Sequence, residues 1–198
     1  MYYFRGSQIF QYICRMKLDT TTFQGLTKPV YILEEQRLRR NLQLISDVAK
    51  AADVEIILAF KAYALWKTFP IFREYIRATT ASSLYEAKLG NTEFGAPTHT
   101  FSPAYTDYEI DEIACCSSHL VFNSLTQFTR FFNRATAVNP QLSCGLRVNP
   151  EYSEVDTLIY NPCAAGTRFG VSADKLPTDL PKGIDGFRCD MAEMVPSS

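Results

Sequence analysis

The sequence predicts an α/β fold built on a parallel sheet, and three observations support this prediction. Short apolar segments with strand-like composition alternate with longer segments whose apolar residues recur at helical spacing. The segment 54–60 is so apolar that we expect a strand buried on both faces. Serine precedes two of the helical segments, where its side chain can cap a helix. Strands that alternate with helices form parallel sheets with right-handed crossovers, so a doubly wound sheet and a barrel both fit.

The elements follow one another along the whole chain. A short apolar strand at 30–33 leads into a helix at 34–52, where apolar residues from Leu38 to Ala49 recur at helical spacing. After the strand at 54–60, the remaining expected strands lie at 78–81, 98–102, 119–123, 143–148 and 184–187. The remaining expected helices lie at 69–76, 82–89, 107–116, 124–137 and 172–176, and residues 149–170 form a long polar loop.

Capping and breaking residues set the expected helix ends. Pro70 stands at a tolerated first-turn position. Ser82 or Ser83 caps the next helix, which Gly90 closes. Ser124 caps a later helix, which ends before the Asn-Pro pair at 139–140.

Composition narrows the class of protein. The chain has 198 residues, 46% hydrophobic and 21% charged, which is ordinary for a globular protein. A net charge of −1 gives no reason to expect a nucleic acid or an anionic membrane as partner, and no segment approaches the roughly 20 apolar residues of a membrane span. Six cysteines match no zinc-ligand spacing, and His99 and His119 read as a loop residue and a strand-start residue. We therefore expect no metal, reduced thiols and a cytoplasmic location.

Lys61 stands where the apolar strand at 54–60 meets its loop. A desolvated lysine has a lowered pKa, and its uncharged amine can attack an aldehyde to form a Schiff base. The alternative is a lysine that extends to solvent from a strand end.

Four separate segments of the sequence, one of which contains Lys61, carry a resemblance to a known family. They are 58–70, which begins Leu-Ala-Phe-Lys-Ala-Tyr; 79–87, around Ser83-Leu84-Tyr85-Glu86; 146–151, Leu-Arg-Val-Asn-Pro-Glu; and 160–163, Tyr-Asn-Pro-Cys. Together they resemble the carboxynorspermidine (carboxyspermidine) decarboxylases, a branch of the fold-type III pyridoxal-phosphate decarboxylases. The resemblance runs from about Lys28 to Phe187 and favours a (β/α)8 barrel of the alanine racemase type.

The resemblance implies roles for four residues. Lys61 would hold pyridoxal 5′-phosphate covalently. Glu86 would face the cofactor ring, although the same spacing makes it a capping-box glutamate. Arg147 would bind a ring hydroxyl or an acidic group, although a surface salt bridge is the alternative. Arg168 would support the active-site face beside the tight turn at Gly170, although it could be an ordinary loop arginine. An acidic segment at 151–160, which includes Glu154 and Asp156, could face the ammonium groups of a polyamine.

The resemblance also implies a domain organisation. We expect a flexible N-terminal extension at 1–27, a partial cofactor-binding barrel at 28–187 and an aberrant tail at 188–198, in which Arg188 stands where the family has a histidine-bearing strand. A complete barrel takes about 250 residues. The C-terminal half of the barrel and a β domain would then be missing, and this form would be inactive or marginal.

The resemblance therefore implies a pyridoxal-phosphate decarboxylase that converts carboxynorspermidine or carboxyspermidine to norspermidine or spermidine, in a family whose full-length members are homodimers. Two alternatives stay open. One is another decarboxylase of the same fold, acting on diaminopimelate, ornithine or arginine. The other is a non-catalytic chain that pairs with a full-length homologue.

Overall fold

The computed structural model describes residues 24–25, 27–153, 155, 157, 160–164 and 166–189. The chain divides into two compact units, Met1–Leu38 and Arg39–Ser198, and all the strands belong to the second. The predicted extension at 1–27 lies almost entirely outside the described residues, as do all but two residues of the predicted tail at 188–198.

The predicted strand at 30–33 does not form. These residues are in coil, with Val30 52% exposed and Tyr31 fully exposed. An extended segment is stable only when its backbone pairs with another strand, and none is paired with it in the described part of the chain. The helix that follows is confirmed as α2 (Glu35–Ala52), and Arg37 in its first turn pairs with Glu34 at 2.8 Å.

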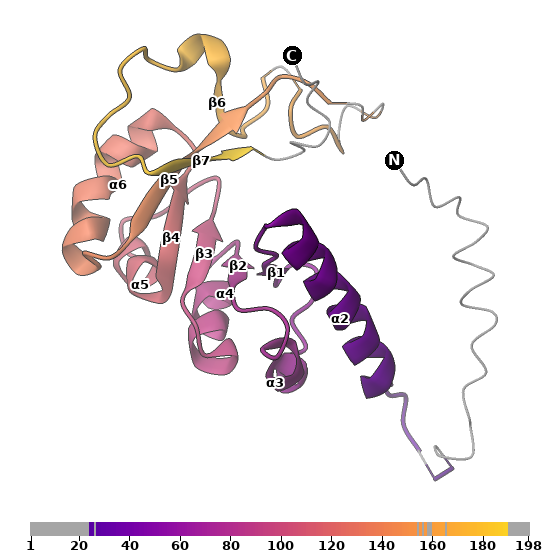
Figure 1. The fold of residues 1–198 in the computed structure, drawn as a ribbon. Helices are drawn as coiled ribbons and strands as arrows, with labels where there is room; N and C mark the ends of the chain where they lie inside the picture. The colour runs from indigo at the N-terminus through magenta and orange to yellow at the C-terminus, as the bar shows by residue number, and fades with distance from the viewer. Residues whose placement is uncertain are drawn as a thin grey trace. The chain divides into compact units, whose positions relative to one another are not determined.

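A parallel sheet forms the centre of the second unit (Figure 1). Its strands are β1 (Leu58–Ala59), β2 (Thr79–Ala81), β3 (Thr98–Phe101), β4 (Ser117–Phe122), β5 (Ser143–Asn149), β6 (Val171–Ser172) and β7 (Gly186–Cys189). They pair in the order β1-β2-β3-β4-β5-β6, and β7 also pairs with β5. Every pairing is parallel, which confirms the predicted α/β class.

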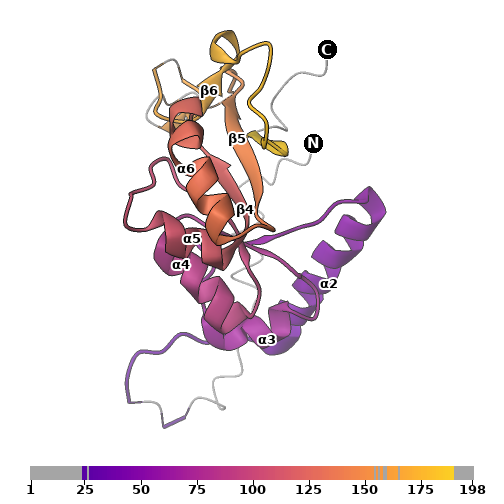
Figure 2. The ribbon, with the colours of Figure 1, turned by 90° about the vertical axis from the view of Figure 1, so that its left-hand side faces the viewer.

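The way the sheet is wound distinguishes the two forms that periodicity left open. Helices α4 (Leu84–Leu89), α5 (Ile110–Cys116) and α6 (Leu125–Val138) all cover the same face of the sheet (Figures 1 and 2). A doubly wound sheet reverses its strand order and places helices on both faces. Sequential strands with crossovers on one face are the winding of a barrel. In the described part of the chain β1 pairs only with β2, so the sheet is open there.

The hydrophobic core lies between the sheet and these helices. Leu120 and Phe122 of β4 are fully buried, and Ile110 of α5 and Phe131 of α6 pack in the same cluster. Burying a side chain of this size stabilises the fold by about 1.5–3 kcal/mol. Among the described residues, no helix combines the length and apolar character needed to cross a membrane.

The two predicted serine caps are confirmed. Ser83 Oγ accepts a hydrogen bond from Glu86 N at 3.2 Å, and Ser124 Oγ accepts one from Gln127 N at 3.1 Å. These bonds satisfy backbone donors that the first turn of a helix leaves open. The two serines therefore fix where α4 and α6 begin.

The predicted end of α4 at Leu89, with Gly90 as its cap, is confirmed, but the helical path does not stop there. The chain continues as a π-helical turn, Gly90–Phe94, and leaves it at Gly95 with φ 77°. A Cβ atom at Gly90 would lie 2.2 Å from Thr98 Cγ2. Gly90 therefore permits close packing against β3, and Gly95 supplies the left-handed residue that ends the turn.

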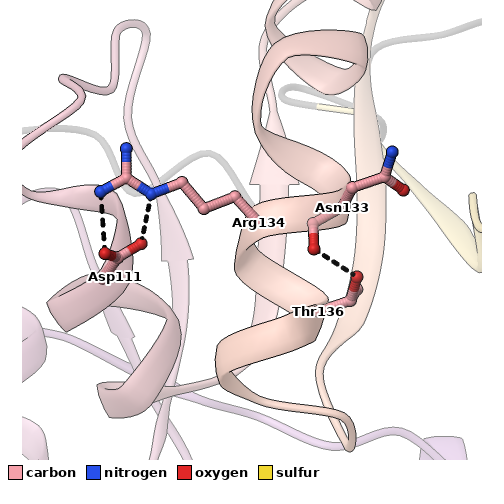
Figure 3. A network of polar contacts seen from close by, with 4 residues as sticks. All are labelled: Asp111, Asn133, Arg134 and Thr136. Atoms are coloured by element: carbon pink, nitrogen blue, oxygen red, sulfur yellow. Dashed lines mark hydrogen bonds and ion pairs between the residues drawn. The ribbon is translucent and has the colours of Figure 1, made fainter.

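Ion pairs connect α6 to the α5 region. Arg134 donates to Asp111 through Nε at 2.6 Å and Nη2 at 2.8 Å (Figure 3). This hydrogen bonding lowers the pKa of Asp111. One turn earlier in α6, Arg130 pairs with Asp107. In the same view Thr136 Oγ1 donates to the backbone oxygen of Asn133 at 3.4 Å, a bond within α6 (Figure 3).

Candidate active site

A cavity of about 500 Å³ opens at the carboxyl ends of the strands. Its described lining consists of Lys61, Ser82, Phe101, Pro103, Arg147, Pro162, Phe169 and Arg188. Lys61 and Ser82 follow β1 and β2, Phe101 ends β3, and the arginines belong to β5 and β7. Active sites of parallel α/β proteins lie at this end of the sheet.

Lys61 is held at the cavity by the turn that follows β1. The backbone N–H groups of Ala62 and Tyr63 both donate to Ala59 O, at 2.9 Å and 3.1 Å. Phe60 is buried against Phe69, with ring centroids 5.4 Å apart, and anchors the residue before the lysine. Lys61 therefore faces the cavity from a fixed backbone.

Two expectations about this segment are wrong. The strand expected at 54–60 is reduced to β1, and Val54 is exposed instead of buried. The Lys61 side chain is exposed, so the desolvation that we expected is absent. The reason is that, among the described residues, β1 pairs only with the three-residue β2, and the cavity is open to solvent.

Arg147 occupies a buried position between aromatic rings. It is 4% exposed, which rules out the surface position of the alternative interpretation. Its guanidinium carbon lies 4.9 Å from the ring centroid of Phe101 and 4.4 Å from that of Phe169. A guanidinium is weakly hydrated and stacks well on aromatic faces, which makes this position favourable for arginine.

Arg168 lies outside the cavity lining but contacts one of its walls. Its side chain is exposed and lies 4.3 Å from the ring centroid of Phe169. Asn123 holds this loop by donating to Arg168 O at 2.7 Å and accepting from Gly170 N at 2.8 Å. The predicted tight turn at Gly170 is confirmed by its φ of 78°.

Glu86 makes a variant of the expected capping box, because its carboxylate binds the N–H of the residue before the N-cap Ser83. Its Oε2 accepts a hydrogen bond from Ser82 N at 2.6 Å, while Ser83 caps the Glu86 N–H. Ser82 lines the cavity and Glu86 is not among its described lining residues. Glu86 therefore contacts a residue of the cavity wall instead of the cavity itself, and its hydrogen bond fixes the backbone of Ser82.

Phe101 and Arg188 are among the cavity residues that reasoning from sequence did not assign to the site. Phe101 lies under both Arg147 and Arg188, the latter at 4.7 Å from its ring centroid. We assigned Arg188 to the tail, but it lies inside β7, paired in register with Arg147. The sequence signal was present, because Gly186 and Arg188 alternate and so face the same side of a strand that begins near 184.

The acidic segment at 151–160 is only partly described. Glu151 is exposed with φ 54°, whereas Glu154 and Asp156 lie outside the described residues. A role of this segment toward ammonium groups stays a prediction.

The two histidines lie in strands instead of at loop or strand-start positions. His99 of β3 pairs in register with His119 of β4, and their ring centroids are 3.9 Å apart. Burial lowers the pKa of His99, and the neighbouring His119 lowers it further. Among the described residues, no group of three His, Cys, Asp or Glu side chains could hold a metal ion.

Comparison with known proteins relates this chain to a group of decarboxylases. No model of a known protein family matches the chain. Carboxyaminopropylagmatine decarboxylase of Synechocystis sp. is 41% identical over 170 residues, which are 86% of this chain and 43% of that protein. The carboxynorspermidine/carboxyspermidine decarboxylase of Campylobacter jejuni is 40% identical over 83% of this chain and 42% of that protein. The one from Herminiimonas arsenicoxydans is 38% identical over 81% and 43%.

The chain is a homologue of these decarboxylases. It spans less than half the length of the curated relatives it matches. A crystal structure of carboxynorspermidine decarboxylase from C. jejuni, complexed with norspermidine, matches with a TM-score of 0.72 and 34% identity. The match covers 83% of this chain and 41% of that one. The predicted resemblance and the predicted partial likeness to this fold are thus confirmed.

Proposed function

We propose that this chain carries the cofactor-lysine part of a pyridoxal-phosphate-dependent decarboxylase that acts on a carboxylated polyamine. The observation that carries the proposal is the presence of Lys61 and Arg147 in one cavity at the carboxyl ends of the strands. The decarboxylase relatives support the reaction class. Their printed names favour carboxylated polyamines over diaminopimelate, ornithine or arginine.

The residues of the cavity fit pyridoxal phosphate. Three of the eight described lining residues are cationic, and two are phenylalanines. These suit a planar ligand that carries anionic oxygens. When bound, the cofactor supplies an electron sink for the charge left by departing carbon dioxide.

Each protein group has a distinct task in this proposal. The Lys61 amine faces the cavity and would react with the cofactor aldehyde. The Arg147 guanidinium, held between Phe101 and Phe169, would donate hydrogen bonds to an anionic oxygen of the ligand. Glu86 and Arg168 act indirectly, because Glu86 fixes Ser82 and Arg168 stacks on Phe169.

The names of the relatives support the proposed substrate class, and the charge of the cavity agrees with it. Carboxynorspermidine, carboxyspermidine and carboxyaminopropylagmatine share a carboxylate next to a chain of cationic nitrogens. The cationic lining suits the carboxylate end, whereas the ammonium end requires acidic groups, for which the segment at 151–160 is the candidate. A homodimeric assembly and a cytoplasmic location also belong to the proposal.

Borohydride trapping tests the central contact. The chain is incubated with pyridoxal 5′-phosphate and reduced, and the labelled peptide is identified by mass spectrometry. We expect the label on Lys61, its loss in Lys61→Arg and its retention in Lys67→Arg, since Lys67 is a nearby exposed lysine outside the cavity lining. Labelling that ignores Lys61 would reject the proposal. Carbon dioxide release from carboxynorspermidine, carboxyspermidine and carboxyaminopropylagmatine then ranks the substrates.

A further inference from the structure

Arg188 enters the cavity from β7, beside the arginine of β5. Arg147 and Arg188 are register partners in neighbouring parallel strands. Paired residues of this kind face the same side of a sheet, about 4.8 Å apart at the backbone. Both side chains line the same cavity as Lys61.

The two guanidinium groups also share one aromatic ring. Their Cζ atoms lie 4.9 Å and 4.7 Å from the ring centroid of Phe101. Phe101 is itself buried, so its ring is a fixed platform that both guanidinium groups contact. We call the chain of contacts Arg188–Phe101–Arg147–Phe169–Arg168 the arginine–phenylalanine stack.

This arrangement has the chemistry of an anion site. Two guanidinium groups at paired positions of neighbouring strands concentrate positive potential on one cavity wall, which attracts an anion. Guanidinium groups present planar sets of donors that match a carboxylate or a phosphate. A lysine on the same cavity wall adds to the positive potential.

We propose that Arg188 and Arg147 together bind the anionic group, a carboxylate or a phosphate monoester, of the ligand in the Lys61 cavity. The identity of that ligand rests on the proposed function. Arg188 is then a ligand-binding residue that sets specificity for a charged group, and its contribution is separate from that of the covalent lysine. Phe101 positions both guanidinium groups but makes no hydrogen bond to the anion itself.

Binding measurements on the full chain test this proposal. Wild type, Arg188→Met, Arg188→Lys and Arg130→Met are compared. Arg130 is the matched control, because it also lies over a phenylalanine, Phe131 at 5.1 Å, but on α6 and outside the cavity lining. The probes are pyridoxal 5′-phosphate against pyridoxal, carboxynorspermidine against norspermidine, and inorganic phosphate. Thermal unfolding without ligand verifies that each variant is folded, and Arg188→Lys retains the charge if Arg188→Met does not fold.

The pattern of losses identifies the bound group. If Arg188 binds the cofactor phosphate, Arg188→Met weakens the binding of pyridoxal 5′-phosphate by about tenfold or more and leaves the binding of pyridoxal unchanged. The reason is that loss of a hydrogen bond to a charged group has at least that effect on affinity. If it binds the substrate carboxylate, the same loss affects carboxynorspermidine and spares norspermidine. Arg130→Met should match wild type with every probe.

Two results would overturn the proposal. One is binding of every anionic probe by folded Arg188→Met within twofold of wild type. The other is the absence of binding of any anionic probe by the wild-type chain. Failure of the proposed function gives a different result. Inorganic phosphate would then still stabilise the chain against thermal unfolding in a way that depends on Arg188, but Lys61 would carry no label. That result would retain the anion site and reject the cofactor.

Discussion

Replacing Phe101 by leucine should lower the stability of the protein by removing the centre of the arginine–phenylalanine stack. A cation–π contact is worth about 0.5–1 kcal/mol at an exposed site and about 2 kcal/mol when desolvated. Arg147 is 4% exposed and Arg188 is half-buried, so their contacts with Phe101 belong near the upper and lower values, respectively. The two contacts together amount to about 2.5–3 kcal/mol. Urea unfolding of the full chain measures the change in the free energy of unfolding.

A double-mutant cycle separates the contact from the lost apolar volume. Phe101→Leu is measured in wild type and in Arg147→Met, and we expect a coupling energy of about 2 kcal/mol. The matched pair is Phe131 with Arg130, whose arginine side chain is 61% exposed. That pair should couple by no more than about 1 kcal/mol. Equal coupling in the two pairs, or less than about 0.5 kcal/mol for Phe101 with Arg147, would refute the reasoning.

Two further predictions concern titrating groups in the second unit. Burial and the neighbouring Asp185 raise the pKa of Cys144 to about 11, so its thiol stays protonated at neutral pH. We expect an alkylating reagent to modify Cys144 only after denaturation, long after it modifies the exposed Cys115. Mass spectrometry of the alkylated peptides measures the two rates, and equal rates would contradict the prediction. Burial and the neighbouring His119 lower the pKa of His99, and Glu55 opposes this shift. Below the ordinary histidine pKa the unfolded chain therefore binds more protons than the folded chain. The free energy of unfolding should then fall as the pH drops through about 6.5. His99→Gln should reduce the fall in melting temperature between about pH 7.5 and about pH 5.5; a fall as large as in wild type would contradict this interpretation of the histidine pair.

Elements with local signals could be predicted from sequence. The caps at Ser83 and Ser124 depend on a side chain and a backbone N–H three residues later, so the sequence contains the whole interaction. The helix α2 and the helices of the sheet layer follow from apolar spacing. Strand length behaves differently, because β1 can pair only as far as Thr79 and Thr80 of β2 allow. Partners distant in the sequence set that limit.

The glycine at 90 shows the same difference between local and tertiary causes. A glycine after a helical segment usually ends the helical path, and α4 does end here, but the chain continues as a π-helical turn. Its contact with Thr98 instead demands a residue without a side chain in a continuing helical turn. No feature within a few residues of Gly90 contains this information.

The candidate site was only partly predictable for a related reason. Lys61 and Arg147 have chemistry that draws attention wherever they occur, and the structure brings them into one cavity. Glu86 and Arg168 lie behind the cavity wall, which spacing alone could not decide. Arg188 was missed because its strand, β7, pairs with β5, and a long loop, β6 and a short 3₁₀ turn separate the two strands in the sequence.

The arginine–phenylalanine stack has a consequence for how the protein is made. Phe101 leaves the ribosome well before Arg147, and Arg188 emerges last of the three. A nascent chain therefore contains its aromatic platform before either of its cationic neighbours has been made. Capture of an anion by this pair of arginines must wait until translation has passed β7, so ligand added during synthesis should not rescue chains arrested before that strand.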